Sequence, residues 1–342
     1  MRHLLNTLYI NRDGAYIARD GETLDIRLEG DSLRKFPIHL FESVVCFGRV
    51  GLSPGAMDLC AEHGVAVSFM SVYGRFIARL SGPVHGNVLL RRQQYRLADD
   101  EERSAAVARA MIAAKIANSR AVLQRAARDQ KDANTYAQPV ANLAAQLRII
   151  QSEPLTLEEL RGIEGDSAGE YFGCFDAMIL NEKGSFFFHG RNRRPPTDRV
   201  NALLSLGYSL LAADVTSALE TVGLDPCVGF LHRDRPGRPS LALDLMEELR
   251  AYLVDRFVLS LINLRKLRAD DFDTRENGAV SLTDTARKEA FLQSWQTRKQ
   301  EEITHPYLNE KIPLGLLPYV QATLLARAIR GDLDGYPPFF LR

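Results

Sequence analysis

The first part of the chain alternates short apolar runs with turn residues, a pattern that predicts β-strands. Asp13-Gly14 and Asp20-Gly21 are typical of hairpin turns. One helix should interrupt the strands, because Ser53 can cap it, Pro54 suits its first turn and Gly64 can end it. The strands are expected at Leu8–Ile10, Ala15–Ala18, Thr23–Leu28, Val65–Met70 and Phe76–Leu80, with Thr23–Leu28 alternating as a half-buried strand does. We therefore expect residues 1–85 to form a small, β-rich, sandwich-like domain.

From Val88 onward the apolar residues recur at helical spacing. An alanine-rich stretch places Ile112, Ile116, Ser119 and Leu123 on one face, and further helices are expected near 140–150, 156–180, 199–221, 240–268, 283–302 and 313–330. Exposed loops are expected at 183–196 and 270–280. The domain boundary should lie within Ser81–Asn87, where glycine and proline break the pattern. The predicted fold is α+β, with an all-α domain at residues 86–342 following the β-rich domain.

Charge and composition narrow the class of protein. The chain has 342 residues, and its 43 Lys and Arg residues balance 43 Asp and Glu residues. This balance argues against nucleic-acid binding by bulk charge, although a local patch can still bind DNA. No apolar run reaches membrane-spanning length and the first residues lack a signal-peptide core, so we expect a cytoplasmic protein without a membrane partner. The four cysteines, Cys46, Cys60, Cys174 and Cys227, lack CxxC spacing and suit a reducing compartment.

The segment from Gly223 to Arg250, GLDPCVGFLHRDRPGRPSLALDLMEELR, carries the strongest chemical signal. It places His232 in a loop before a helix that Pro239 and Ser240 should start, with Ser240 as the cap. Asp244 and Glu247 stand at i, i+3 and therefore project from one face, while Leu241, Leu245 and Leu249 form the buried stripe. Histidine nitrogen with carboxylate oxygen can hold Mn²⁺, or Mg²⁺ with water. A surface cluster of ion pairs is the alternative interpretation.

A second segment, Thr156 to Ile179, is predicted to be helical. Thr156 and Glu159 form a capping-box pattern, and the apolar stripe comprises Leu160, Ile163, Ser167, Tyr171, Cys174 and Met178. Glu164 lies inside this helix and precedes Gly165. A helical glycine costs about 1 kcal/mol relative to alanine, which suggests the close approach of a backbone or ligand, or plain helix packing.

Arginines are concentrated near these segments. Residues 191–199 are rich in arginine, and a second group shares the loop of His232. The candidate DNA-binding residues are Arg191, Arg193, Arg194, Arg233, Arg235 and Arg238. Guanidinium groups around a metal site suit a phosphodiester substrate, whereas solvated surface charge is the plainer interpretation.

Together, the two segments closely resemble the CRISPR-associated adaptation integrase, the larger of the two proteins that insert new spacers into CRISPR arrays. Pro195–Val215 and Phe47–Leu80 resemble further parts of that family, so the likeness covers nearly the whole chain. The N-terminal sequence LLNTLYINRDGAYIARDGE and the ending FFLR are similar to subtype I-C. The resemblance implies a metal-dependent DNA endonuclease and integrase.

The family's site residues can be carried over onto this chain. The resemblance places the metal-binding glutamate at Glu164, the histidine at His232 and the acidic ligand at Glu247, with Asp244 as a further catalytic acid. Some members have aspartate in place of Glu247, so either Asp244 or Glu247 could be the closer ligand. One Mn²⁺ or Mg²⁺ ion is expected, with a second, substrate-bridged ion left open.

The resemblance also implies partners. These are double-stranded DNA (the incoming spacer and the leader-repeat), a second copy in a homodimer, a small ferredoxin-like adaptation protein that completes a heterohexamer, and an iron–sulfur CRISPR nuclease. The alternative functions are a free-standing structure-selective DNA nuclease and a non-catalytic DNA-binding scaffold.

Overall fold

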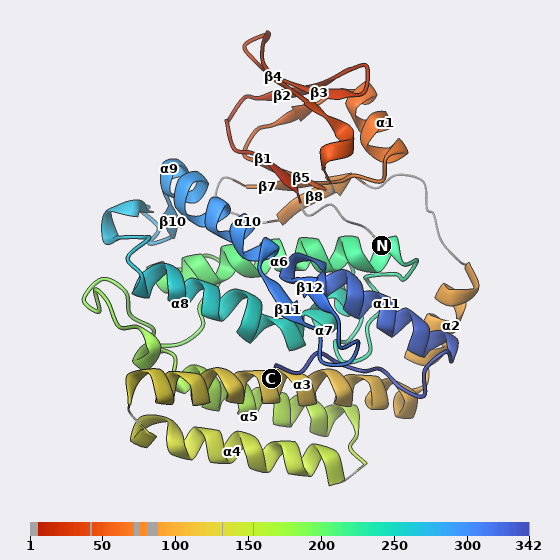
Figure 1. Cartoon of the computed structure of the whole chain (residues 1–342), viewed down its shortest axis with the longest axis vertical. Coiled ribbons are helices and arrows are strands. Elements are labelled where there is room, and N and C mark those ends of the chain that lie inside the picture. Colours follow the sequence, from red (N-terminus) through yellow and green to blue (C-terminus); the bar gives the residue numbers. More distant parts are fainter. Residues whose placement is uncertain are drawn as a thin grey trace.

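The computed structural model describes residues 6–41, 43–71, 76–80, 88–131, 133–152 and 154–341. A strand-rich region comes first and a larger helical region follows it, with the strands above the helices in Figure 1. The protein is therefore a mixed α+β structure, as the sequence predicts. The predicted boundary at Ser81–Asn87 lies outside the described residues.

The strand-rich region contains two four-stranded sheets. Its elements are β1 (Thr7–Ile10), β2 (Tyr16–Asp20), β3 (Thr23–Leu28), β4 (Asp31–Pro37), η1 (Ile38–Leu40), β5 (Ser43–Phe47), β6 (Gly51–Leu52), α1 (Pro54–Glu62), β7 (Ala66–Met70) and β8 (Phe76–Leu80). One sheet has the order β4-β3-β2-β6. The other, which we call the interface sheet, has the order β1-β5-β7-β8, with β1, β5 and β7 parallel. Helix α1 starts as predicted, with the Ser53 side chain accepting from the Ala56 N–H.

The two predicted hairpin turns have different outcomes. The Asp20-Gly21 turn is confirmed, because β2 and β3 pair antiparallel and Gly21 has a φ of 58°. The Asp13-Gly14 hairpin is wrong, because β1 and β2 belong to different sheets. The Asp13 carboxylate instead accepts from the Arg49 backbone N–H at 2.8 Å. The expected alternation of Thr23–Leu28 is also wrong, since Asp25 is buried between two buried apolar neighbours.

Strand β5 is buried on both faces and the sequence pattern missed it. Val44 and Cys46 pack into the core between the two sheets, whereas Val45 and Phe47 pack into the core of the helical region. A strand covered on both sides carries a continuous apolar run and no alternation. The Arg287 guanidinium also lies over the Phe47 ring, 5.1 Å from its centroid. The interface sheet is thus enclosed between the other sheet and the helices.

The helical region is built from long helices and two small hairpins. Its elements are α2 (Val88–Ala98), α3 (Glu101–Gln130), α4 (Ala133–Ser152), α5 (Leu157–Gly173), η2 (Asp176–Met178), α6 (Arg199–Thr221), α7 (Ser240–Leu249), η3 (Arg250–Asp255), α8 (Arg256–Asn263), η4 (Ala269–Asp271), β9 (Phe272–Thr274), β10 (Val280–Leu282), α9 (Asp284–Ala286), η5 (Arg287–Leu292), α10 (Gln293–Gln300), β11 (Glu302–Thr304), β12 (Lys311–Pro313), η6 (Leu314–Leu316) and α11 (Leu317–Arg330).

Several predicted bounds need correction. The helix expected at 156–180 ends at Gly173, and a separate 3₁₀ turn follows it. The helix expected at 240–268 ends at Asn263 and includes the π-helical segment η3. The region is not all-α, because β9 pairs with β10 across the expected loop at 270–280 and β11 pairs with β12.

Helix α6 is a largely buried helix of the helical region that lies next to the interface sheet (Figure 1). By length and composition alone it could cross a membrane, but 56% of its most apolar window is buried inside the fold. Buried residues lie along its whole length, from Val200 to Leu219. The fold therefore accounts for its hydrophobicity as that of a core helix.

A buried carboxylate joins α7 to the end of the chain. Glu248 Oε1 accepts from the Tyr336 hydroxyl at 2.5 Å and from Gln321 Nε2 at 2.9 Å, and its Oε2 accepts from the Phe339 N–H at 3.0 Å. These donors satisfy a carboxylate that is fully enclosed, which burial alone would disfavour. Burial nevertheless raises the pKa of Glu248 to about 7.

Asn118 on α3 completes this attachment. Its side-chain amide donates to the carbonyl oxygens of Glu248, at 2.7 Å, and Phe339, at 2.8 Å. It also accepts from the Leu341 N–H at 2.7 Å. We call residues 336–341, held by Glu248 and Asn118, the C-terminal clasp. The clasp fixes α3, α7 and the end of the chain as one unit (Figure 1).

Tyr336→Phe should destabilise the fold. The change removes a hydroxyl donor and leaves a buried carboxylate oxygen with one partner fewer, which costs about 1–3 kcal/mol. Urea unfolding should show this loss as a lower midpoint. Tyr307→Phe is the matched control, because Tyr307 is 50% exposed. Equal midpoints for the two variants would contradict the role assigned to the Tyr336 hydroxyl.

Candidate active site

Helix α7 is almost completely enclosed. Leu241, Leu245 and Leu249 form the buried stripe that the sequence predicts, each with no exposed surface. Asp244 is also fully buried, and Glu247 retains 4% exposure. Charged groups in such an environment need partners, because losing their hydration costs several kcal/mol per ion.

The start of α7 differs from the prediction. Ser240 is the first helical residue and no side chain caps the helix. The Pro226 carbonyl oxygen instead accepts from the N–H groups of Leu241, at 2.9 Å, and Ala242, at 3.3 Å. The loop that precedes the helix therefore doubles back and satisfies the free donors of the first turn.

The Asp244 carboxylate organises this loop. Its Oδ2 accepts from the backbone N–H groups of Phe230, at 2.6 Å, and Leu231, at 2.9 Å. Its Oδ1 lies 3.0 Å from the His232 backbone nitrogen and 2.5 Å from His232 Nδ1. A Cβ at Gly229 would lie 2.7 Å from Asp244 Oδ2 and 2.8 Å from the Ser240 carbonyl carbon, so the loop needs glycine there.

This hydrogen bond orients the imidazole of His232. An ionised carboxylate only accepts, so Nδ1 carries the shared proton. In the neutral ring, Nε2 then has the free lone pair that can bind a metal ion. Four donors surround Asp244, so its direct role is to position the loop and the ring. The sequence prediction placed Asp244 and Glu247 on one face but could not distinguish these roles.

Glu247 and Glu164 are brought together through Lys115 of α3. The Lys115 ammonium hydrogen-bonds Glu164 Oε1 and lies 2.7 Å from Glu247 Oε2. Arg250 Nη2 lies 3.0 Å from the other oxygen, Glu247 Oε1. Burial would raise the pKa of Glu247, but Arg250 and then Lys115 outweigh it and hold the pKa at about 2. Glu247 is therefore ionised at neutral pH.

Helix α5 carries Glu164 to this position. Its Thr156–Glu159 capping box is confirmed. Arg161 Nε donates to the Leu231 carbonyl at 2.9 Å, and the Arg233 guanidinium hydrogen-bonds Glu158. These contacts fasten the start of α5 to the His232 loop.

Two of the three interpretations of Gly165, close approach of a backbone and helix packing, are wrong, and approach of a ligand stays a prediction. A Cβ there would meet nothing within 4 Å, so neither a neighbouring backbone nor tight helix packing requires this glycine. The surface beside Glu164 is open instead, and the side chain of Glu164 retains 28% exposure.

Glu164, His232 and Glu247 are side chains of the types that bind divalent cations, but they do not surround one common point in this structure. Within the described ranges, no three His, Cys, Asp or Glu side chains form a group that could share an ion. Lys115 instead links the two glutamates. Glu247 Oε2 is enclosed, and its contact with Lys115 is an ion pair without hydrogen-bond alignment. An under-satisfied carboxylate oxygen beside a second carboxylate and an oriented imidazole suits Mn²⁺ or Mg²⁺.

Sequence reasoning missed the cations around the glutamates. Lys115 interrupts an apolar stretch, AMIAAKIA, and a lone lysine on a buried helix was the available signal. Arg250 begins the π-helical segment η3, and its guanidinium lies over the Tyr208 ring at 5.3 Å. The Tyr208 hydroxyl donates to Asp255 Oδ1 at 2.5 Å, which continues the polar network away from the site.

The two predicted arginine groups meet beside the site. Burial lowers the pKa of Arg238, and Arg235, Arg193 and Arg194 lower it further by repulsion. We call these four arginines the rim arginines. The other two candidates have protein partners.

Arg191 and Arg233 are the two candidates with partners in the protein. Arg191 donates to Asn201 Oδ1 at 2.6 Å and lies over the Tyr208 ring. Arg233 is paired with Glu158 but remains 70% exposed. Their observed contacts are therefore structural, and the rim arginines are the freer candidates for DNA contact.

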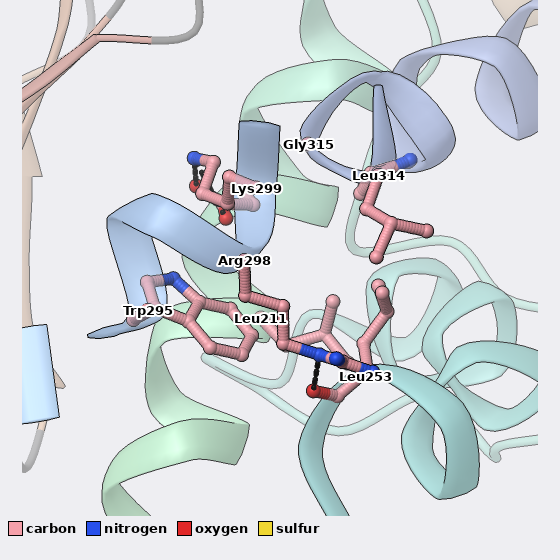
Figure 2. A pocket seen from close by; sticks show the side chains of 9 residues that line it. Leu211, Leu253, Trp295, Arg298, Lys299, Leu314 and Gly315 are labelled. Carbon is pink, nitrogen blue, oxygen red and sulfur yellow. Dashed lines mark hydrogen bonds and ion pairs between the residues drawn. The ribbon is translucent and has the colours of Figure 1, made fainter. Parts of the chain in front are cut away.

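The pocket in Figure 2 is not this site. It lies between α6, η3, α10 and η6, where Trp295 and Arg298 lie beside Leu211 and Leu253, while the Lys299 ammonium turns away to the Asp214 carboxylate. Its volume of about 10 Å³ is marginal for a single water molecule. Among the described residues that line it, none belongs to the predicted site, so the candidate chemistry lies elsewhere.

Comparison with known proteins shows what this arrangement resembles. Residues 8–297 match the family model described as CRISPR associated protein Cas1. A CRISPR-associated endonuclease Cas1 of Rhodospirillum rubrum is 51% identical over 99% of both chains. One from Chlorobaculum tepidum is 49% identical over the full length of both. Among solved structures, a casposase bound to integration product has a TM-score of 0.84 at 25% identity, covering 97% of this chain and 93% of that one.

Two further similarities concern larger assemblies. A fusion of a CRISPR-associated exonuclease Cas4 and an endonuclease Cas1 from Geobacter sulfurreducens is 39% identical, over 98% of this chain and 60% of the fusion. A Cas6-RT-Cas1–Cas2 complex contains a chain that matches all of this one with a TM-score of 0.84, at 22% identity and over 37% of its own length. The second likeness concerns the fold alone.

Asp255→Asn should remove a pH dependence of stability. Burial raises the pKa of Asp255 from 3.8 to about 6, even though Tyr208, Arg191 and Arg250 oppose the rise. The folded state therefore keeps a proton that the unfolded chain releases between these values. The free energy of unfolding should fall by on the order of 3 kcal/mol as the pH rises from about 4 to about 6.

The asparagine variant lacks this contribution but can still accept from Tyr208. The difference in unfolding free energy between variant and wild type should therefore grow in favour of the variant across that pH range. Urea unfolding at several pH values measures it. Asp270→Asn, at an exposed position, should follow the wild type. Parallel profiles for Asp255→Asn and wild type would show that Asp255 is not the titrating group.

Proposed function

The chain belongs to the family of CRISPR-associated Cas1 proteins, and from that membership we propose that it inserts new spacers into a CRISPR array. It is a DNA endonuclease and integrase, as its relatives and the casposase neighbour indicate. The reaction is attack by a 3′-hydroxyl of the incoming DNA on a target phosphodiester. The observation that supports this most directly is that Lys115 joins Glu164 to Glu247, while Asp244, one turn before Glu247 on α7, orients the ring of His232.

The proposed ligands of the catalytic ion are Glu164, His232 and Glu247. A bound Mn²⁺ or Mg²⁺ ion would polarise the phosphoryl oxygen and stabilise charge on the leaving 3′-oxygen. His232 presents Nε2, because Asp244 holds its Nδ1. We infer that Glu247 is the closer ligand and that Asp244 positions the ring, since backbone N–H groups already occupy the Asp244 oxygens.

The rim arginines are proposed to hold the DNA backbone. Phosphate contacts fix a duplex in place without reading its sequence, and guanidinium groups suit them. Burial and then repulsion among these arginines lower the pKa of Arg238, and a phosphate would relieve the repulsion. Arg191 and Arg233 instead support the fold around the site through Asn201 and Glu158.

Hydrolysis is the second candidate activity. The same carboxylates and histidine, with water in place of the 3′-hydroxyl, would cut branched DNA. A single assay that follows both strand transfer and strand cutting separates integrase from free-standing nuclease. The non-catalytic scaffold is set aside, because the relatives are endonucleases over the whole length of the chain.

The proposed partners follow from the larger assemblies. A Cas1–Cas2 complex and a Cas4–Cas1 fusion support a small adaptation protein and an iron–sulfur nuclease as partners. We propose a homodimer within a heterohexamer, of subtype I-C. Phe76 and Ile77, 47% and 55% exposed on the edge strand β8, suit the dimer contact. The four cysteines are unpaired, which suits action in the cytoplasm.

Glu164→Ala, His232→Ala and Glu247→Ala should each reduce spacer integration by at least about 100-fold while DNA affinity changes little. The reason is that the proposed ligands and the rim arginines are separate groups. Integration into a supercoiled leader-repeat plasmid with Mn²⁺ measures the first quantity, and fluorescence anisotropy measures the second. Asp166→Ala is the control on α5, since Asp166 is exposed two residues after Glu164. A ligand variant with wild-type strand transfer would refute that residue's assignment.

Reversing the charge of Arg193 and Arg194 should weaken binding to unrelated DNA sequences equally. Each lost phosphate contact lowers the slope of log affinity against log salt by ~0.9, so the double change should lower it by ~2. Titrations at several salt concentrations give this slope. Arg12→Glu with Arg34→Glu, exposed in the strand-rich region, makes the same charge change as a control. An unchanged slope would mean that these arginines make no phosphate contact.

A further inference from the structure

Lys115 occupies the space between the two glutamates of the site. Its ammonium hydrogen-bonds Glu164 Oε1 and lies 2.7 Å from Glu247 Oε2, while Arg250 takes Glu247 Oε1. Both Glu247 oxygens are thus paired with cations of the protein itself. A divalent ion shared by these carboxylates would need an oxygen from each of them. The ammonium and the ion therefore compete for the same lone pairs.

The position of Lys115 is built into the fold. It lies at the middle of α3, flanked by the buried residues Ala114 and Ile116, and its side chain is 12% exposed. One turn later, Asn118 fastens α3 to α7 and to the C-terminal clasp. Because the backbone of Lys115 is held in place, its ammonium can leave the carboxylates only by a change of side-chain rotamer. The ammonium therefore stays within the site after an ion displaces it.

We propose that Lys115 is an internal counter-cation that holds Glu164 and Glu247 together without metal and is displaced when the divalent ion binds. This proposal rests on the proposed function, because it assumes that the ion binds these glutamates. The displaced ammonium, still tethered in the site, takes a phosphodiester oxygen as its new partner. Because coupling between binding sites is reciprocal, DNA that attracts Lys115 frees the carboxylates for the ion. The ion and DNA then favour each other's binding.

The first test measures Mn²⁺ affinity without DNA by isothermal titration calorimetry. Lys115→Met should bind Mn²⁺ at least about tenfold more tightly than wild type, which corresponds to ~1.4 kcal/mol. Lys131→Met, the loss of one exposed positive charge at the end of the same helix, should leave the affinity unchanged. Adding Glu164→Gln to Lys115→Met should remove the gain, which would place the tighter binding at this site.

The second test uses thermal unfolding and DNA. Without metal, Lys115→Met should unfold at a lower temperature than wild type, and Mn²⁺ should raise its midpoint by more. Lys115→Gln keeps a polar side chain and serves if the methionine variant does not fold. A duplex with wild-type protein should tighten Mn²⁺ binding by at least about tenfold, and in the Lys115 variants this gain should shrink.

The outcomes separate the two proposals. Equal or weaker Mn²⁺ affinity in folded Lys115→Met, with clear binding in wild type, would overturn the counter-cation role while leaving the metal site intact. No Mn²⁺ binding in any variant, with or without DNA, would overturn the metal site itself and this proposal with it. A DNA-induced gain of equal size in wild type and Lys115→Met would overturn the coupling.

Discussion

The geometry of the site depends on the enclosed carboxylate of Asp244. Three consecutive backbone N–H groups and the His232 ring converge on its two oxygens, so the loop cannot depart from α7 without exposing an unpaired buried charge. Gly229 allows the chain to approach this closely. A single acid on a core helix thereby converts an otherwise irregular, arginine-rich loop into a fixed support for one imidazole nitrogen.

The rest of the site follows the same rule, that each buried carboxylate must have hydrogen-bond or ion-pair partners. Three acids of α7 have different partners. Asp244 binds the His232 loop, Glu247 pairs with Lys115 and Arg250, and Glu248 binds the C-terminal clasp. Each acid joins a different part of the chain to the helix. The proposed ligand Glu247 and its neighbours are consequently held in place, because the fold needs the same partners to satisfy buried charge.

The sequence predicted well whatever depends on neighbours along the chain. The α1 and α5 caps, the Leu241–Leu249 stripe and the order of the site segments are local features. The roles of Glu164 and His232 came from the resemblance and stay predictions. It missed Lys115 and Asn118, because their partners lie 49 to 223 residues away. It missed β5 because burial on both faces removes the alternation. The Ser240 cap failed because a carbonyl from Pro226 took its place.

The C-terminal clasp has a consequence for how the protein is made. Synthesis proceeds from the N-terminus, and Glu248 finds its last partner 91 residues after it has itself been added. At about 5–20 residues per second, α7 waits several seconds on the ribosome before Glu248, the neighbour of Glu247, gains this donor. A chain that stops before Phe339 can still form α7, but it leaves the buried Glu248 oxygen without this donor.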